Sequence, residues 1–491
     1  MAAVVSSFID LPSFLVITKT VNDWILKHFS WMFSLGSLYL LVLAIVTYFS
    51  PLAKIRIGGK DAKPLLSKPR WFMITLCTTL AVGMLLWSTA EPIYHLNSPP
   101  ISLSHIQAGS PDAALFSMSA MFLHWSFTPY AIYAIPSLVF ALAFYNKQLP
   151  FSISSSLNPV FGKWVSGNKR SQFIDTLAMY SLVTGMAASL GTGAITLVGG
   201  VGEFSSITSN PLSLGIAVAL VVLTFVVSAA SGLHKGIARL SSLNAWLLLF
   251  IGLFVFLFGP TLYILTLGVE GLGEYLDNFF TLSLFTGASS GDLWPQNWSV
   301  FYWAVWFAWA PVSALFLGRI ARGYTVREFL QINLIFPSLF AIFWISIFSG
   351  SAIHIDLVEG GIMHTILTEE GLEKLLYYVF ERLPLSYGMT AVLLFVAFIS
   401  YVTAADSNTD AIGNLCTKDV TLDNINGSSV PMKVLWGVII GLVAWVMISF
   451  VGIEGVKMLS NLGGLPALLI ILATSLTLIK WLKDPNELIR N

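Results

Sequence analysis

Aromatic side chains gather in two stretches of this chain, and the chemistry that best fits them is the binding of an organic cation. One stretch runs from Phe122 to Pro136 and the other from Trp298 to Phe329. Indole and phenol faces attract cations that cannot donate hydrogen bonds, above all quaternary ammonium groups. For any single ring, helix packing or an interfacial aromatic belt is the alternative. The candidate rings are Trp125, Tyr130, Tyr133, Trp306 and Trp309.

The elements that must position these rings are membrane helices. Of 491 residues, 56% are hydrophobic and 10% are charged, whereas soluble domains carry about 25% charged residues. An all-α integral membrane protein in a lipid bilayer is therefore predicted. The net charge is +0 and no long basic run exists, so no nucleic-acid partner is indicated. The two cysteines, Cys77 and Cys416, are too few for a disulfide scaffold or a structural zinc site. We expect no cofactor and no metal.

Eleven membrane spans are expected. Residues 1–30 hold only a short apolar piece interrupted by Asp10 and Pro12, and about ten residues cannot cross the hydrocarbon core as a helix. We therefore expect a short N-terminal segment over 1–30 that is not a full span, and an extra transmembrane helix over 31–50. The remaining spans are predicted near 71–92, 113–145, 173–200, 211–231, 241–268, 298–318, 332–352, 387–411, 434–453 and 458–481.

The distribution of Lys and Arg predicts the orientation. Of these 25 residues, 20 fall in segments that eleven spans place on one side, and cytoplasmic loops are the ones enriched in them. This places the short tail, 482–491, in the cytoplasm. The five spans within 71–268 begin inside and the five within 298–481 begin outside, which is typical of inverted repeats that bind substrate near the midplane.

Several motifs resemble those of the betaine/carnitine/choline transporter family. The string FYWAVWFAWAP, followed by ARGYTVREF, is similar to the family's FYW-x-WW-x-x-W-x-P and ARISRGRTIREF. KIRIGGKDAKP, AEPIYH and SGLHKGIARLS match further motifs. The resemblance covers about 54 to 480. It implies a sodium-symporter-like (LeuT-type) 5+5 inverted-repeat bundle in the bacterial inner membrane, a homotrimer, and a first core helix broken around Gly83.

The resemblance also implies a substrate site. Trp125, Tyr130, Tyr133 and Trp306 would form an aromatic cage, and Trp309 a secondary station. Two residues depart from the family pattern: Val305 replaces the first Trp of the pair, and Tyr130 replaces a Trp. Family members that take choline resemble this chain but carry Asp at the position of Gly83. Because burying a lone cation without an anion is costly, a zwitterion that brings its own carboxylate is the better fit here.

The coupling ion stays open at this stage. Positions matching the family's sodium site are Thr403, Ser241 and Asn244, but Ala404 lacks the hydroxyl that the family has there. Sodium coupling, proton coupling and exchange all remain. Glu91, beside Pro92, is interpreted as a capping acid at the outer helix end in preference to a proton carrier. His124 is interpreted as a satisfied core histidine in preference to a proton relay. Metal binding by His124 is not indicated, because no second His or carboxylate lies three or four residues further on.

We therefore expect a secondary active transporter of small quaternary-ammonium or sulfonium zwitterions that works by alternating access. Glycine betaine, carnitine or a related osmolyte is the expected substrate. The alternatives are a non-transporting sensor or channel on the same scaffold and a cation-independent exchanger. An enzyme is not expected, because no catalytic constellation is present.

Overall fold

The computed structural model describes residues 10–79, 81–165, 168–230, 234–416 and 430–489. Their regular structure is helical, apart from an isolated bridge between Arg56 and Thr325, so the all-α prediction is confirmed. The longer helices are α2 (Leu11–Phe49), α3 (Lys68–Thr79), α4 (Ala81–Asn97), α5 (Pro111–Trp125), α6 (Phe127–Tyr145), α8 (Asn168–Gly202), α9 (Pro211–Ala230), α10 (His234–Phe258), α11 (Thr261–Asp277), α14 (Ser299–Arg319), α16 (Phe336–Val358), α19 (Ser386–Leu415), α20 (Val430–Phe450) and α21 (Ile453–Lys483).

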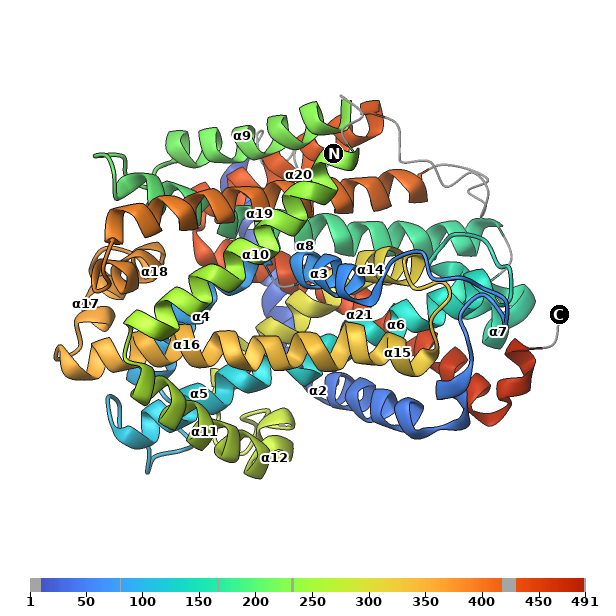
Figure 1. The fold of residues 1–491 in the computed structure, drawn as a ribbon, viewed down its shortest axis with the longest axis horizontal. Helices are drawn as coiled ribbons and strands as arrows, with labels where there is room; N and C mark the ends of the chain where they lie inside the picture. Colours follow the sequence, from blue (N-terminus) through green and yellow to red (C-terminus); the bar gives the residue numbers. More distant parts are fainter. Residues whose placement is uncertain (1–9, 80, 166–167, 231–233, 417–429, 490–491) are drawn as a thin grey trace.

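Short helices cap the two ends of the bundle. They are α7 (Asn158–Phe161), α12 (Phe279–Ser283), α13 (Trp294–Asn297), α15 (Val326–Leu330), α17 (Ile362–Glu369) and α18 (Leu372–Glu381). In Figure 1, α17 and α18 lie at one end of the long helices, while α7 and α15 lie toward the other. The helix α14 runs through the middle, packed against α6, α8 and α21.

The apolar helices account for the predicted spans. Within the described residues, eight helices are long and apolar enough to cross a membrane, and two bent pairs raise this to as many as ten. Residues 211–227 form a shorter apolar helix. Each of the eleven predicted segments overlaps one of these elements. Their grouping into two inverted repeats, 71–268 and 298–481, stays a prediction.

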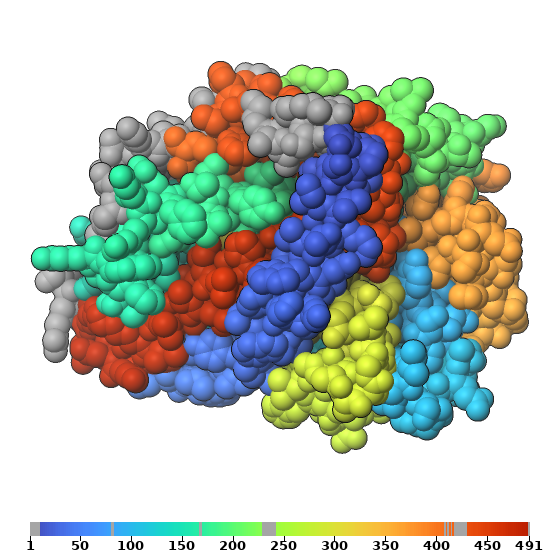
Figure 2. Space-filling view, turned by 180° about the vertical axis from the view of Figure 1, so that it is seen from behind, coloured from blue at the N-terminus to red at the C-terminus, as the bar shows by residue number. Residues whose placement is uncertain are grey.

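The N-terminal boundary expected at residue 31 is wrong. Helix α2 begins at Leu11 and runs without a break for 39 residues. Asp10 is its N-cap, accepting a hydrogen bond from the Ser13 backbone N–H at 3.1 Å, and Pro12 lies in the first turn. An acid and a proline in this order start helices instead of interrupting them. Figure 2 shows α2, in blue, lying diagonally across one face beside α21, in red.

Two predicted spans are broken in the middle. Residues 68–79 and 83–97 lie at 57° to each other, and residues 242–258 and 261–277 lie at 107°. The first break confirms that the first core helix is interrupted around Gly83. Backbone groups freed by such breaks are tolerated at membrane depth only where protein or a cavity surrounds them.

The basic loops meet at one end of the bundle, as expected for loops that lie on the same side of a membrane. The loop after α2 is hydrogen-bonded to the loop after α14. The loop after α6 contacts both the loop after α2 and the C-terminal tail. The contacts are Arg56 Nη1 to Gly323 O at 2.5 Å, Ile57 N to Tyr324 O at 2.9 Å, Gly58 N to Asn146 Oδ1 at 2.9 Å, Lys68 Nζ to Glu328 Oε1 at 2.7 Å and Lys147 Nζ to Glu487 O at 3.0 Å. That this end faces the cytoplasm stays a prediction.

At the other end, an acidic loop is joined to its neighbour. Asp292 accepts hydrogen bonds from the backbone N–H of Ser102 at 2.9 Å, from the Ser102 hydroxyl at 2.8 Å and from the backbone N–H of Trp294 at 2.9 Å. Burial raises the pKa of Asp292, but these hydrogen bonds outweigh it and hold the pKa below its ordinary value. The carboxylate therefore fastens the loop before α14 to the loop after α4.

Candidate binding site

A small cavity lies among the central helices. Its volume is about 80 Å³, and its walls come from both halves of the chain. The lining residues are Thr78, Thr79, Gly83, Trp87, Trp125, Tyr133, Gly185, Ala188, Ser189, Thr192, Phe301, Tyr302, Val305, Trp306, Trp309, Ala404, Val456 and Ser460. A largely apolar lining with few polar groups is the usual composition of a ligand site.

The four predicted cage residues meet at Trp306. Its ring centroid lies 5.8 Å from that of Trp125, 5.7 Å from that of Tyr130 and 4.9 Å from that of Tyr133. Trp125, Tyr133 and Trp306 line the cavity, whereas Tyr130 is fully buried and supports Trp306 without lining it. The structure therefore brings all four together but gives the cavity three of them.

A helix break positions Trp125 and Tyr133. Helix α5 ends at Trp125 and α6 begins at Phe127, with Ser126 between them in a non-helical conformation. The Ser126 hydroxyl donates to the Phe122 carbonyl at 2.5 Å, which satisfies an end group of α5. The two aromatic residues thus lie on consecutive helices, α5 and α6, on either side of the interruption at Ser126.

Hydrogen bonds hold the three tryptophans in place. Trp125 Nε1 donates to Glu91 Oε2 at 2.8 Å, Trp306 Nε1 to the His124 carbonyl at 3.2 Å, and Trp309 Nε1 to the Gly185 carbonyl at 3.1 Å. Because each indole N–H is already bonded to protein, what the ring offers the cavity is its apolar π face. This is the group that a cation without hydrogen-bond donors needs.

Three further aromatic residues line the cavity, and the sequence reasoning did not single them out. The ring of Trp87 lies 5.7 Å from Phe301 and 6.1 Å from Tyr302, and Tyr302 lies 5.2 Å from Trp125. Phe301 and Tyr302 stand in the same aromatic run as Trp306. Trp87 lies one helical turn beyond Gly83, so the two residues share a face of α4, and this spacing could have indicated that Trp87 lines the cavity. Val305 also lines the cavity, so an aliphatic wall stands where the family has a tryptophan.

Gly83 lies in the first turn of α4 and faces Trp125. A Cβ there would stand 3.3 Å from Trp125 Cη2 and 3.8 Å from Trp87 Cδ1, so only hydrogen fits without moving the indole. The first N–H groups of a helix lack intrahelical partners and carry a partial positive charge. The start of α4 therefore offers an anion-binding element next to the aromatic rings.

Two of the predicted ion residues are connected through a serine that the sequence reasoning missed. Asn244 Nδ2 donates to Ser400 Oγ at 2.9 Å, and Thr403 Oγ1 donates to the Ser400 carbonyl at 3.1 Å. Asn244 Oδ1 is buried and has no partner among the described residues. Ser400 lies three residues before Thr403 on α19, so helical spacing was the signal. The side chain of Ser241 lies outside the described part of the structure.

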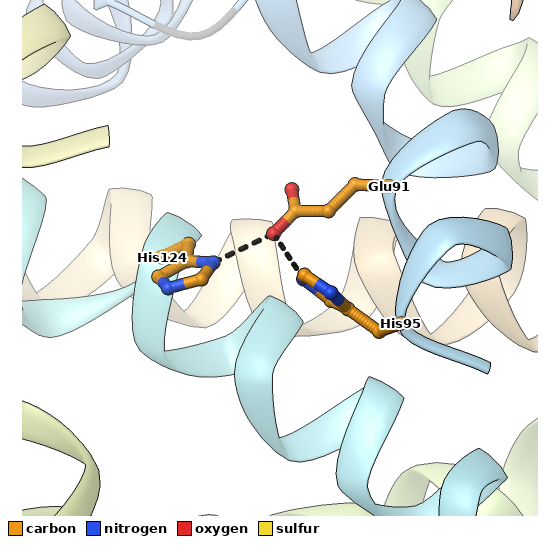
Figure 3. A group of neighbouring side chains, drawn as sticks. All are labelled: Glu91, His95 and His124. Carbon is orange, nitrogen blue, oxygen red and sulfur yellow. Dashed lines mark hydrogen bonds and ion pairs between the residues drawn. The ribbon is translucent and has the colours of Figure 1, made fainter. Parts of the chain in front are cut away.

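A buried triad of Glu91, His95 and His124 lies beside the cage. Glu91 Oε1 is 2.6 Å from His124 Nδ1 and 3.1 Å from His95 Nε2, and all three side chains are fully buried. Figure 3 shows Glu91 and His95 on one helix and His124 on the next, pointing toward one another. The interpretation of Glu91 as a capping acid is wrong, because it lies in the middle of α4.

The triad escaped the sequence reasoning because its partners lie on different helices. The sequence around His124 offers no partner on its own helix, whereas the packing of α4 against α5 brings Glu91 into contact with it. Glu91 and His95 are four residues apart, and this spacing was a visible sign of a shared helix face. His124 Nε2 also lies 2.9 Å from Ser299 Oγ at the start of α14.

Together, the broken core helix, the aromatic cavity and the buried polar network define a multi-span membrane protein whose candidate ligand site is the cavity among its central helices. The family model of the betaine/carnitine/choline transporters matches residues 1–487. The chain therefore belongs to this family, whose members are transporters and not enzymes.

Three relatives illustrate the match. A probable glycine betaine transporter of Desulfitobacterium hafniense is 32% identical over 464 residues, covering 92% of this chain and 90% of the relative. An ectoine/hydroxyectoine transporter of Virgibacillus pantothenticus is 31% identical, covering 91% and 87%. A high-affinity choline transport protein of Escherichia coli is 30% identical, covering 94% and 67%.

Proposed function

We propose that this protein is a secondary active transporter of small quaternary-ammonium or sulfonium osmolytes in the bacterial plasma membrane. The observation that carries the proposal is the cavity lined by the aromatic side chains of Trp125, Tyr133 and Trp306. Relatives named for glycine betaine and choline support it, since both compounds carry a trimethylammonium group. An onium group offers no N–H to bond, so ring faces are its natural partners.

The substrate is a zwitterion in this proposal. The onium group lies among the rings, and its carboxylate meets the N–H groups at the start of α4 beside Gly83. This arrangement is favourable because the helix start supplies a partial positive charge without adding a buried ion. A net cation lacks that second contact and is expected to bind less tightly.

The coupling ion, where one is used, is held near Asn244 and Thr403. Both belong to helices that pack against α3, the first half of the broken core helix. An ion there would join α10 and α19 to the same helix whose break borders the cavity. Occupancy of the two sites would thereby stabilise the same arrangement of helices. Na⁺ is the ion best matched to uncharged oxygen ligands, and H⁺ is the alternative.

Uptake into liposomes tests the function. Purified protein is reconstituted and supplied with labelled glycine betaine, choline or ectoine, with and without an inward Na⁺ gradient and with and without a pH gradient. Accumulation of one compound above its external concentration is expected. Binding without accumulation would favour the sensor alternative, and the absence of binding of any of the three would refute the site.

A matched pair of tryptophan variants connects function to the cavity. Trp306→Ala is expected to lower affinity about tenfold or more, since a desolvated cation–π contact contributes about 2 kcal/mol. Trp246→Ala is the control, because Trp246 lies on α10 with 59% of its surface exposed. Equal affinity in the two variants would place the substrate elsewhere.

A further inference from the structure

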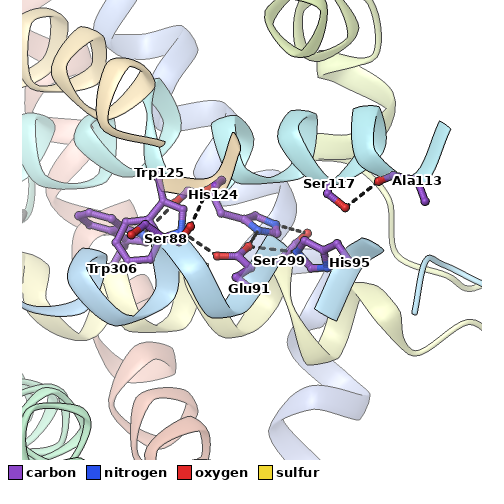
Figure 4. Close-up of polar contacts among 10 residues, drawn as sticks. Ser88, Glu91, His95, Ala113, Ser117, His124, Trp125, Ser299 and Trp306 are labelled. Carbon is purple, nitrogen blue, oxygen red and sulfur yellow. Dashed lines mark hydrogen bonds and ion pairs between the residues drawn. The ribbon is translucent and has the colours of Figure 1, made fainter. Parts of the chain in front are cut away.

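The buried triad of Glu91, His95 and His124 is not used by the function proposed above. Charged side chains inside a membrane bundle are costly and are usually functional. Here a carboxylate and two imidazoles are fully buried, and they lie directly behind a wall of the cavity. Figure 4 shows the network extending from His95 through Glu91 to Trp125, with Trp306 beside it.

The hydrogen bonds indicate where the charges lie. Three nitrogen atoms lie within hydrogen-bond distance of the Glu91 carboxyl group: His124 Nδ1 and His95 Nε2 at Oε1, and Trp125 Nε1, which donates to Oε2. When Glu91 is ionised and each imidazole carries its proton on the nitrogen that faces Oε1, all three contacts are satisfied at once. Glu91 is taken as the anion of the triad, with its charge spread over these three donors.

One added proton would make the triad neutral overall, and His124 is the residue that can hold it. The second ring nitrogen of His124, Nε2, lies 2.9 Å from the Ser299 hydroxyl, which can either donate or accept. His95 Nδ1 is buried with no partner among the described residues, so a proton there would be an unsatisfied donor. The hydrogen-bond geometry therefore favours His124 over His95 as the imidazole that would hold an added proton.

Few other titratable groups face the triad in the described structure. From α14, Tyr302 stacks on His124 with ring centroids 4.8 Å apart. From α21, Lys457 Nζ lies 4.8 Å from the ring of Trp298, whose centroid is 4.7 Å from that of His95.

The remaining acids lie further along the neighbouring helices and have other partners. From α16, Asp356 is bonded to Asn97 at 3.1 Å, beyond the triad on α4. From α18, Glu373 is bonded to Ser209 at 2.7 Å. Neither contacts a member of the triad, so the titratable side chains bonded to Glu91 in the described structure are the two imidazoles.

Trp125 links the triad to the cavity. Its N–H donates to an anion, and a charge-assisted hydrogen bond of this kind polarises the donor. Electron density shifts toward the ring face, which is the surface that attracts a cation. When His124 is protonated, the net charge behind the ring disappears and the polarisation weakens.

We propose that the triad of Glu91, His95 and His124 is a proton-titratable counter-charge for the onium group, acting through the Trp125 indole. Glu91 is a positioning residue in this scheme and does not touch the substrate. The inference rests on the proposed function, since it needs an onium group in the cage. It also explains how a cage without an acidic lining residue can attract a cation.

The direction of the effect follows from linkage. A proton on His124 and a cation in the cage oppose each other, so each lowers the affinity for the other by the same factor. Substrate binding is expected to release protons, and affinity for choline is expected to rise with pH by about threefold to tenfold in total across the titration range. A net cation such as choline feels this more than a zwitterion, whose carboxylate offsets part of the charge.

Calorimetry of the whole protein in lipid nanodiscs tests the inference. Choline and glycine betaine are titrated at constant Na⁺ in two buffers of different ionisation enthalpy, which gives the number of protons released per ligand bound. Wild type is expected to release protons, more with choline than with glycine betaine. Glu91→Gln is expected to bind choline about threefold to tenfold more weakly, with no proton release and no pH dependence.

Glu373→Gln is the matched control, because Glu373 is a largely buried acid outside the triad. It should keep the wild-type proton count. Wild-type binding without proton release at any pH between about 5.5 and 8.5 overturns the inference alone, as does unchanged pH dependence in Glu91→Gln. Absence of all onium binding by wild type overturns the proposed function as well. If Glu91→Gln does not fold, the wild-type proton count decides.

Discussion

Replacing Gly83 by Asp is expected to change the substrate preference from zwitterion to net cation. The new Cβ would lie 3.3 Å from Trp125 Cη2, so the indole must move by a few tenths of an ångström. The carboxylate would then stand beside the cage. For charges about 6 Å apart at an effective dielectric constant of about 20, the attraction is about 3 kcal/mol.

Part of this attraction is offset by burying the new carboxylate. The expected gain in choline affinity is therefore about tenfold to a hundredfold. Glycine betaine is expected to bind more weakly than to wild type, because its carboxylate would meet a like charge near the start of α4. The preference is measured as the ratio of the two dissociation constants by calorimetry.

Gly83→Asn is the matched control, since the amide has nearly the same shape and imposes the same contact on Trp125. It should weaken both ligands without changing their ratio. The reasoning is refuted if Asn changes the ratio as much as Asp does, because the effect would then be steric. It is also refuted if Asp leaves the ratio at its wild-type value.

Three further outcomes are expected. Asn244→Ala should weaken Na⁺-stimulated substrate binding about tenfold and leave Na⁺-free binding unchanged, and equal loss in both conditions would contradict an ion role. Gly464→Val should lower the free energy of unfolding by about 1–3 kcal/mol, as measured by thermal unfolding, because its Cβ would lie 2.7 Å from the Ala304 backbone. Gly388→Ala should leave the free energy of unfolding unchanged, because open space surrounds Gly388. Asp292→Asn should lower the unfolding temperature near neutral pH. The pKa of Asp292 is lower in the folded protein than the unfolded value of about 3.9, so its carboxylate stabilises the fold above that value. The difference between the variant and wild type should vanish as the pH falls through the pKa of Asp292 in the folded protein.

The aromatic rings and the broken core helix could be predicted because their signals are local. A run such as FYWAVWFAW marks its helix by composition, and the stretch around Gly83 matches a known broken helix. The pairing of Glu91 with His124 could not be predicted in this way, since it depends on how α4 lies against α5. The break at Ser126 also escaped prediction, because the sequence there reads as a continuous apolar helix.

For the N-terminal helix, a local signal in the sequence led to a wrong prediction. Asp10 and Pro12 were interpreted as an interruption, although the same two residues are good start signals when a helix follows. What the prediction lacked was the partner. Asn22 on α2 accepts a hydrogen bond from Asn461 on α21 at 2.8 Å, and Tyr39 lies 2.8 Å from Ser475. Such polar contacts hold a helix whose first half is only weakly apolar.

The pairing of loops at the basic end restricts how the bundle can move. The backbone of Ile57, ahead of α3, is bonded to that of Tyr324, just after α14, and Arg56 is bonded to Gly323. These contacts join the segment before α3, the first half of the broken helix, to the segment after α14, which carries Trp306. A passage that opens at this end must therefore either move α3 and α14 together or first break these hydrogen bonds. In the first case, α3 and α14 turn together, and the exit opens along the helices that these contacts do not join.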